Sequence, residues 1–131
     1  MQIVEMKSID DWKNTIDNNV IVVTDFWAGW CRPCLMLGET MKKMAHEDDG
    51  KYNKIFVAKI NTEEGEFVNL SQQLQIHSIP TMFIHLNGKQ IVFGTQDGQV
   101  DRIMGALPRQ NLEKLFEAII GESEKVVEAK S

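Results

Sequence analysis

Cysteine, proline and long apolar runs are scarce in this chain. Its 131 residues include two cysteines, three prolines and one tyrosine, and no apolar run is longer than four residues. A bilayer-spanning helix needs about 20 apolar residues. Lysine and arginine total 14 against 19 acidic residues, whereas a nucleic-acid binder needs positive charge to neutralise phosphates. We therefore expect neither a membrane nor a nucleic acid as a partner.

The N-terminus and the length predict one domain in a reducing compartment. The first dozen residues, MQIVEMKSIDDW, contain acidic residues and no apolar run followed by a cleavage site, unlike a secretory signal. We therefore expect a cytoplasmic protein, in which a structural disulfide is unusual. The length predicts a single domain. We place it at residues 1–121 and expect a charged, frayed tail at 122–131.

Apolar periodicity predicts alternating strands and helices. Strands are expected at 3–6, 20–27, 54–60, 81–86 and 89–93, and helices at 9–17, from the cysteines to about 46, at 66–75 and at 108–120. Ser8 stands at capping-box spacing from Asp11, Asn87-Gly88 is a favoured hairpin turn, and Gly121 is expected to cap the last helix. The order βαβαβαββα predicts an α/β fold, a mixed central sheet with helices on both faces.

Both cysteines, Cys31 and Cys34, lie in the stretch WAGWCRPC. A zinc site or an iron–sulfur cluster needs four ligands, and His46, His77 and His85 do not form a second half-site, so no metal is expected. A purely structural disulfide would close a loop too short to remove much chain entropy. Redox chemistry is therefore the favoured role of the pair.

The position of the pair also favours thiol–disulfide exchange. Cys31 follows a predicted strand and opens a predicted helix, with Pro33 in its first turn. Free amides and the helix dipole lower the pKa of a thiol there, and the thiolate is the attacking form. We expect Cys31 to be the exposed nucleophile and Cys34 to be the less exposed resolving thiol. A Cys-x-x-Cys pair beside a βαβ pattern is typical of a thioredoxin-like motif.

Five separated segments make the chain resemble the thioredoxin family over nearly its whole length. They are residues 25–34 around the dithiol, 57–61, 79–81, 87–88 and 105–107. The resemblance implies a thioredoxin fold and a thiol–disulfide oxidoreductase that reduces disulfide-containing protein substrates. It implies no bound cofactor besides the redox-active disulfide Cys31–Cys34. It also implies an electron donor of the thioredoxin-reductase type.

The resemblance further implies roles for residues around the dithiol. Asp25 would accept and donate the proton of Cys34, and burial in an apolar strand should raise the pKa of its carboxyl. On the residue alone, Asp25 is as well explained by a strand end that meets water. Lys59 would lie near Asp25, or would be an ordinary exposed strand lysine. Trp27 is expected in the core.

The implied substrate-binding residues surround the dithiol. The resemblance places Pro80 in the cis form, which leaves the backbone of Ile79 free to pair with an extended substrate chain. The full set is Trp30, Arg32, Pro33, Ile79, Pro80, Gly105 and Ala106.

Two departures from the family leave alternatives open. Arg32 stands where the common reducing thioredoxins carry glycine, and a cation there should stabilise the thiolate, which makes the pair a stronger oxidant. This favours a thiol oxidase or disulfide isomerase as an alternative. Residues 90–104 are longer than the matching family segment, and Asp97-Gly98 would turn a second hairpin that pairs 91–93 with 100–104. With the tail, this insertion favours a non-catalytic interaction module.

Overall fold

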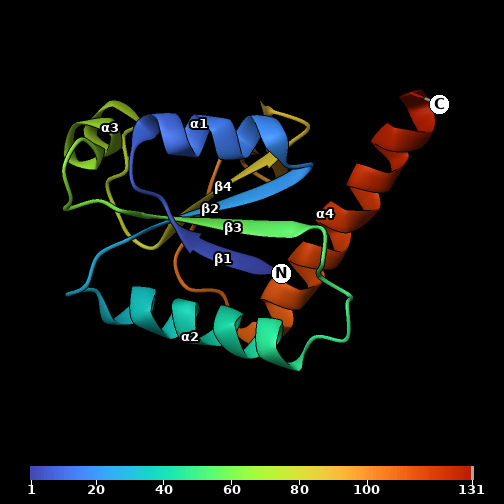
Figure 1. Cartoon of the computed structure of the whole chain (residues 1–131), viewed down its shortest axis with the longest axis horizontal. Coiled ribbons are helices and arrows are strands. Elements are labelled where there is room, and N and C mark those ends of the chain that lie inside the picture. The colour runs from blue at the N-terminus through green and yellow to red at the C-terminus, as the bar shows by residue number, and fades with distance from the viewer. Residues whose placement is uncertain (131) are drawn as a thin grey trace.

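A six-stranded central sheet organises the chain (Figure 1). The computed structural model describes the backbone of residues 1–130 and the side chains of residues 1–125. The strands are β1 (Gln2–Glu5), β2 (Ile21–Trp27), β3 (Ile55–Asn61), β4 (Thr81–Leu86), β5 (Lys89–Gln90), β6 (Phe93–Thr95), β7 (Gly98–Val100) and β8 (Ile103–Met104). The helices are α1 (Ile9–Asn18), α2 (Arg32–Glu47), α3 (Phe67–Gln73) and α4 (Arg109–Lys130).

The sheet is mixed, as predicted. Its strand order is β1-β3-β2-β4-β5, and β8 also pairs with β4. β1 and β2 run parallel to β3, whereas β4 runs antiparallel to β2. The side chains of β2 are buried from Ile21 to Phe26, as expected of a strand covered on both faces. The two cysteines lie just after this central strand in the sequence.

Helices cover both faces of the sheet and enclose two apolar clusters. On one face, α1 and α3 supply Trp12, Ile16, Phe67 and Leu70. On the other face, α2 and α4 supply Leu37, Met41, Met44, Leu112, Phe116 and Ile119. Figure 1 shows α1 and α3 on one side of the strands and α2 on the opposite side. The helical spacing of these apolar residues therefore gives each helix its buried face.

The first helix begins where the capping-box spacing predicts. Ser8 Oγ accepts a hydrogen bond from the Asp11 amide at 3.0 Å, and the helix begins at Ile9. The indole N–H of Trp12 donates to Thr24 Oγ1 in β2 at 2.8 Å. Because a buried indole N–H needs a partner, this hydrogen bond sets the position of α1 on the sheet.

The last helix is longer than predicted. The expected end at residue 120 with Gly121 as the cap is wrong, because α4 continues to Lys130. Glycine inside a helix costs only about 1 kcal/mol. Beyond it, Ser123 is buried and its hydroxyl donates to the Ile120 carbonyl at 2.7 Å, so the helix still packs there. The backbone of the expected tail is thus helical through Lys130, and Ser131 lies outside the described residues.

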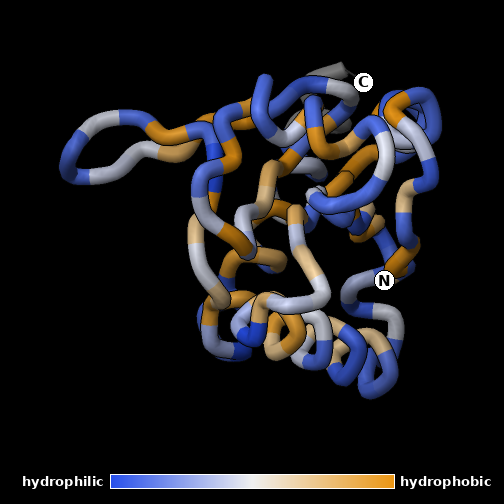
Figure 2. Tube along the Cα trace, turned by 90° about the vertical axis from the view of Figure 1, so that its left-hand side faces the viewer, coloured by the Kyte–Doolittle hydropathy of each residue, from blue (hydrophilic) through white to orange (hydrophobic). Residues whose placement is uncertain are grey.

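The segment 90–104 contains the second hairpin, with a register that differs from the prediction. β6 and β7 pair so that Phe93 lies opposite Val100. The turn falls at Gln96 and Asp97, one residue earlier than predicted, because Thr95 pairs with Gly98. Figure 2 shows this hairpin projecting from the body of the chain.

The residues after the hairpin do not pair with 91–93, which corrects a second part of that prediction. Ile103 and Met104 form β8, which joins β4 opposite Met82 and Thr81. β5 pairs with the other end of β4. The hairpin is therefore inserted between two short strands that share one edge of β4.

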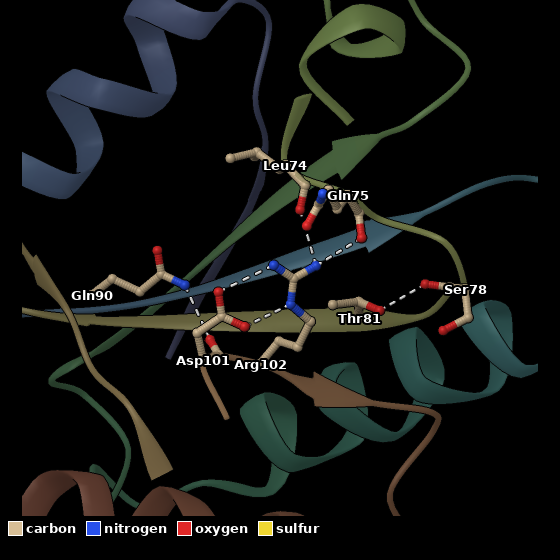
Figure 3. A network of polar contacts seen from close by, with 7 residues as sticks. All are labelled: Leu74, Gln75, Ser78, Thr81, Gln90, Asp101 and Arg102. Atoms are coloured by element: carbon tan, nitrogen blue, oxygen red, sulfur yellow. Dashed lines mark hydrogen bonds and ion pairs between the residues drawn. The ribbon is translucent and has the colours of Figure 1, made fainter. Parts of the chain in front are cut away.

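Arg102 ties the base of the inserted hairpin to the end of α3 (Figure 3). Its guanidinium donates to the carbonyl oxygens of Leu74 at 3.0 Å and Gln75 at 2.9 Å. The same group pairs with Asp101 at 2.7 Å and lies 4.9 Å from the centre of the Phe83 ring. Carbonyls at a helix C-terminus lack helical partners and favour a cation. Arg102 thus secures the start of the loop that leads to β4.

We predict that Arg102→Met lowers the free energy of unfolding by about 2 kcal/mol, since two carbonyls and a carboxylate lose their donor. Urea denaturation measures the change. Arg109→Met is the matched control, because Arg109 makes exposed ion pairs with Glu47 and Glu113. Its loss should cost clearly less than the loss of Arg102, because water screens exposed ion pairs. Equal losses in the two variants would contradict this role of Arg102.

Candidate active site

Cys31 caps the N-terminus of α2 with its own sulfur. The helix begins at Arg32, and Cys31 Sγ accepts a hydrogen bond from the Cys34 amide at 3.2 Å. Pro33 lies in the first turn, where its missing N–H costs little. The two cysteines form a disulfide. The predicted place of the pair at a helix N-terminus is confirmed, and the amides there stabilise negative charge on the Cys31 sulfur after reduction.

Cys31 is more accessible than Cys34 but far less than predicted. Its exposed fraction is 4%, against 0% for Cys34. The prediction of an exposed nucleophile is thus wrong in degree, although the order of accessibility holds. The physical reason is the close approach of the segment before β4, because Cys31 Sγ lies 3.6 Å from the Ile79 carbonyl oxygen.

The Ile79–Pro80 peptide bond is cis, as predicted. The Pro80 carbonyl accepts a hydrogen bond from the Gly105 amide at 2.8 Å. Gly105 has a φ of 90°, a conformation that favours glycine. The structure therefore brings Ile79, Pro80 and Gly105 together next to Cys31, with the exposed Ala106 following in the chain. Their part in substrate binding remains a prediction.

Trp30 and Arg32 are exposed on either side of Cys31 in the sequence. The exposed fraction of Trp30 is 72%, although its indole N–H donates to Glu63 Oε1 at 2.9 Å. Glu63 was not predicted as a site residue, because it belongs to the loop after β3 and no sequence pattern links it to Trp30. This hydrogen bond orients the ring while most of its surface stays open to solvent.

Asp25 is fully buried in β2, and neither of its carboxylate oxygens has a hydrogen-bond partner. Burial raises the pKa of the carboxyl from 3.8 to about 7, and the charge of Lys59 offsets part of that rise. The prediction of a buried Asp25 with a raised pKa is confirmed, and the alternative of a solvated strand end is wrong. The group can therefore gain or lose a proton near neutral pH.

Lys59 lies beside Asp25, because the two residues are paired in the register of β3 and β2. Its ammonium is 4.0 Å from Glu5 Oε1 and 4.4 Å from the centre of the Trp27 ring. Trp27 is half-buried, so the prediction of a core position is wrong. Its ring contacts a cation, and its indole N–H donates to Glu5 Oε2 at 3.3 Å. Glu5 was not predicted, since only the pairing of β1 with β3 places it here.

The chemical groups at the site are a disulfide, a buried carboxyl and an ammonium. Among the described side chains, those of residues 1–125, no group of three or more His, Cys, Asp or Glu is arranged to hold a metal ion. None of the helices in the described backbone, residues 1–130, is long and apolar enough to cross a bilayer.

Comparison with known proteins gives a consistent result. The model of the thioredoxin family matches residues 3–118. A thioredoxin of Chlorobaculum thiosulfatiphilum is 38% identical over 106 residues, which cover 81% of this chain and 85% of the relative. Thioredoxin 1 of Nostoc sp. is 35% identical and covers 80% of this chain and 85% of its own length.

The fold of a solved thioredoxin agrees with this result. The crystal structure of thioredoxin from Malassezia sympodialis superposes with a TM-score of 0.67 at 29% identity, and the match covers 94% of this chain and 95% of that one. The Cys31–Cys34 disulfide lies at the start of α2 in a WCRPC segment, so the pair that performs dithiol–disulfide exchange is present. The chain belongs to the thioredoxin family and is a protein-disulfide reductase that works through Cys31 and Cys34.

Proposed function

We propose that Cys31 is the nucleophile in the reduction of a disulfide in a protein substrate and that Cys34 resolves the intermediate. The Cys31 thiolate attacks one substrate sulfur, the substrate disulfide breaks, and a mixed disulfide forms. Cys34 then attacks the Cys31 sulfur and releases the second substrate thiol. Two electrons pass to the substrate, and the Cys31–Cys34 disulfide remains. The observation that supports this order is the hydrogen bond from the Cys34 amide to Cys31 Sγ.

Asp25 serves this reaction as the proton partner of Cys34. Cys34 has to lose its proton before it attacks Cys31, and both Cys34 and Asp25 are completely buried. A carboxyl with a pKa of about 7 takes up that proton and returns it in the reverse reaction. Lys59, paired in register with Asp25, supplies positive charge that partly stabilises the carboxylate.

The substrate chain binds across the surface around Cys31. The backbone of Ile79 next to the cis peptide bond pairs with an extended segment of the substrate, and Gly105 and Ala106 line the same place. Trp30, which is largely exposed, adds apolar contact area. Arg32 and Pro33, at the start of α2, contact the substrate from the other side of Cys31.

The oxidised protein returns to the dithiol form by exchange with a separate donor of the thioredoxin-reductase type. The reaction uses no cofactor besides the Cys31–Cys34 pair, so the electrons have to come from a separate reductant. We place this cycle in the cytoplasm, where thiols are kept reduced. The substrates are disulfide-containing proteins.

Reduction of insulin by dithiothreitol tests the nucleophile. We expect the wild-type chain to accelerate insulin reduction well above the rate with dithiothreitol alone. Cys31→Ser should give only that background rate, since it lacks the attacking thiolate. Circular dichroism of the variant checks that its fold is intact. No acceleration by the wild-type chain, or an equal rate with Cys31→Ser, would contradict the proposal.

Arg32 should make the pair more oxidising, because its charge stabilises the thiolate and therefore the reduced state. We predict that Arg32→Gly lowers the reduction potential by roughly 10 to 30 mV, as measured by equilibration with glutathione. Arg32→Lys keeps the charge and should retain most of the wild-type value. An equal or higher potential in Arg32→Gly would show that the charge does not act in this way.

A further inference from the structure

Three charged side chains form a row across three neighbouring strands. Glu5 of β1 is paired in register with Lys59 of β3, and Lys59 is paired with Asp25 of β2. Side chains at paired positions of adjacent strands point to the same face of a sheet. Lys59 therefore lies between two carboxyl groups, one on each side, and can pair with either of them.

The ammonium of Lys59 is placed on the side of Glu5. Lys59 Nζ is 4.0 Å from Glu5 Oε1, whereas both oxygens of Asp25 are without any hydrogen-bond partner. Trp27 contacts both partners of this ion pair. The centre of its ring lies 4.4 Å from Lys59 Nζ, and its indole N–H donates to Glu5 Oε2 at 3.3 Å. An aromatic face attracts a cation, so the ring and the carboxylate act together on Lys59.

The helix above the row leaves room for this arrangement. Gly38 of α2 faces Lys59, and a Cβ at that position would lie 3.3 Å from Lys59 Nζ. Glu39 and Lys42 of the same helix line the open pocket beside Glu5 and Lys59. From β4, Met82 lies opposite Asp25 and is apolar. Lys59 is the one cation of this row, and its ammonium is contacted by Glu5 and by the ring of Trp27.

We propose that Glu5 is a positioning residue for the disulfide-exchange reaction: it holds the Lys59 ammonium out of contact with Asp25 and so leaves the Asp25 carboxyl able to take up and return the proton of Cys34. The inference rests on the proposed role of Asp25 as the proton partner of Cys34. A direct ion pair between Lys59 and Asp25 would fix the carboxylate in its charged form. In that form it could not return a proton to Cys34.

Glu5→Gln tests the proposal, because glutamine keeps the shape and can still accept from the Trp27 indole but no longer holds the cation. The measurement is the titration of the Asp25 carboxyl by NMR in the oxidised chain. We expect the pKa of Asp25 to fall by roughly 0.5 to 1 unit in Glu5→Gln. The pH dependence of mixed-disulfide resolution by Cys34 should shift to lower pH by the same amount.

Two further variants separate positioning from simple charge removal. Glu64→Gln removes another carboxylate near Glu5, one that accepts a hydrogen bond from the Asn61 side-chain amide at 3.3 Å, and it should leave the pKa of Asp25 unchanged. In a Lys59→Met background, Glu5→Gln should lose most of its effect on the pKa of Asp25, since no ammonium remains to be released. An Asp25 pKa equal to the wild-type value in Glu5→Gln would overturn the proposal. An equal shift of that pKa with and without Lys59 would also overturn it, because Glu5 would then act only by direct repulsion of the Asp25 carboxylate.

The titration and the turnover assay test different claims, so a negative result in one does not imply a negative result in the other. If the wild-type chain does not accelerate insulin reduction, the proposed catalytic order is wrong, while the titration of Asp25 still reports whether Glu5 positions Lys59. If insulin is reduced and Glu5→Gln leaves both the Asp25 titration and the pH profile unchanged, only the role of Glu5 is lost.

Discussion

The hydrogen bond from the Cys34 amide to the Cys31 sulfur is the interaction on which the site depends. It requires that α2 begin directly after β2, with only residues 28–31 between the central strand and the helix. The strand is buried on both faces, so it provides a rigid base for the sulfur. The helix contributes the amides that stabilise a thiolate. The reactivity of Cys31 is therefore a property of the strand–helix junction.

The second constraint is a buried carboxyl in β2 that no hydrogen-bond donor satisfies. Asp25 is completely buried without a partner, and the half-buried Lys59 lies between it and Glu5. An unpaired buried carboxyl lowers stability unless it stays protonated. Such groups are concentrated where a shifted pKa serves a reaction. The disulfide, the carboxyl and the ammonium are best understood as one unit, in which Glu5 decides where the positive charge lies.

Sequence reasoning was most successful where the deciding forces are local. Apolar periodicity located the main strands and helices, and the Ser8 spacing predicted the start of α1. The same reasoning failed where pairing over long distances decides. Ile103 and Met104 pair with the edge of β4, whereas the sequence predicted that they pair with residues 91–93 in a local hairpin. Gly121 does not end α4, because the helix continues to pack beyond it, where Ser123 is buried.

The site shows the same division between local and distant effects. The dithiol and its helix could be predicted from a single stretch, and the cis bond before Pro80 from the resemblance. Glu5 and Glu63 could not, since each reaches the site only through the register of the sheet or a loop packed against Trp30. The sequence of one strand does not by itself show which residue of a distant strand will lie opposite each of its side chains.

The most direct test of the account is to trap the intermediate. Cys34→Ser and Cys31→Ser are each incubated with a disulfide-containing protein, and the linked cysteine is identified by peptide mass spectrometry. The account predicts a stable mixed disulfide through Cys31 in the first variant and at most traces through Cys34 in the second. Equal trapping through Cys34 would contradict the claim that the helix N-terminus selects Cys31 as the nucleophile.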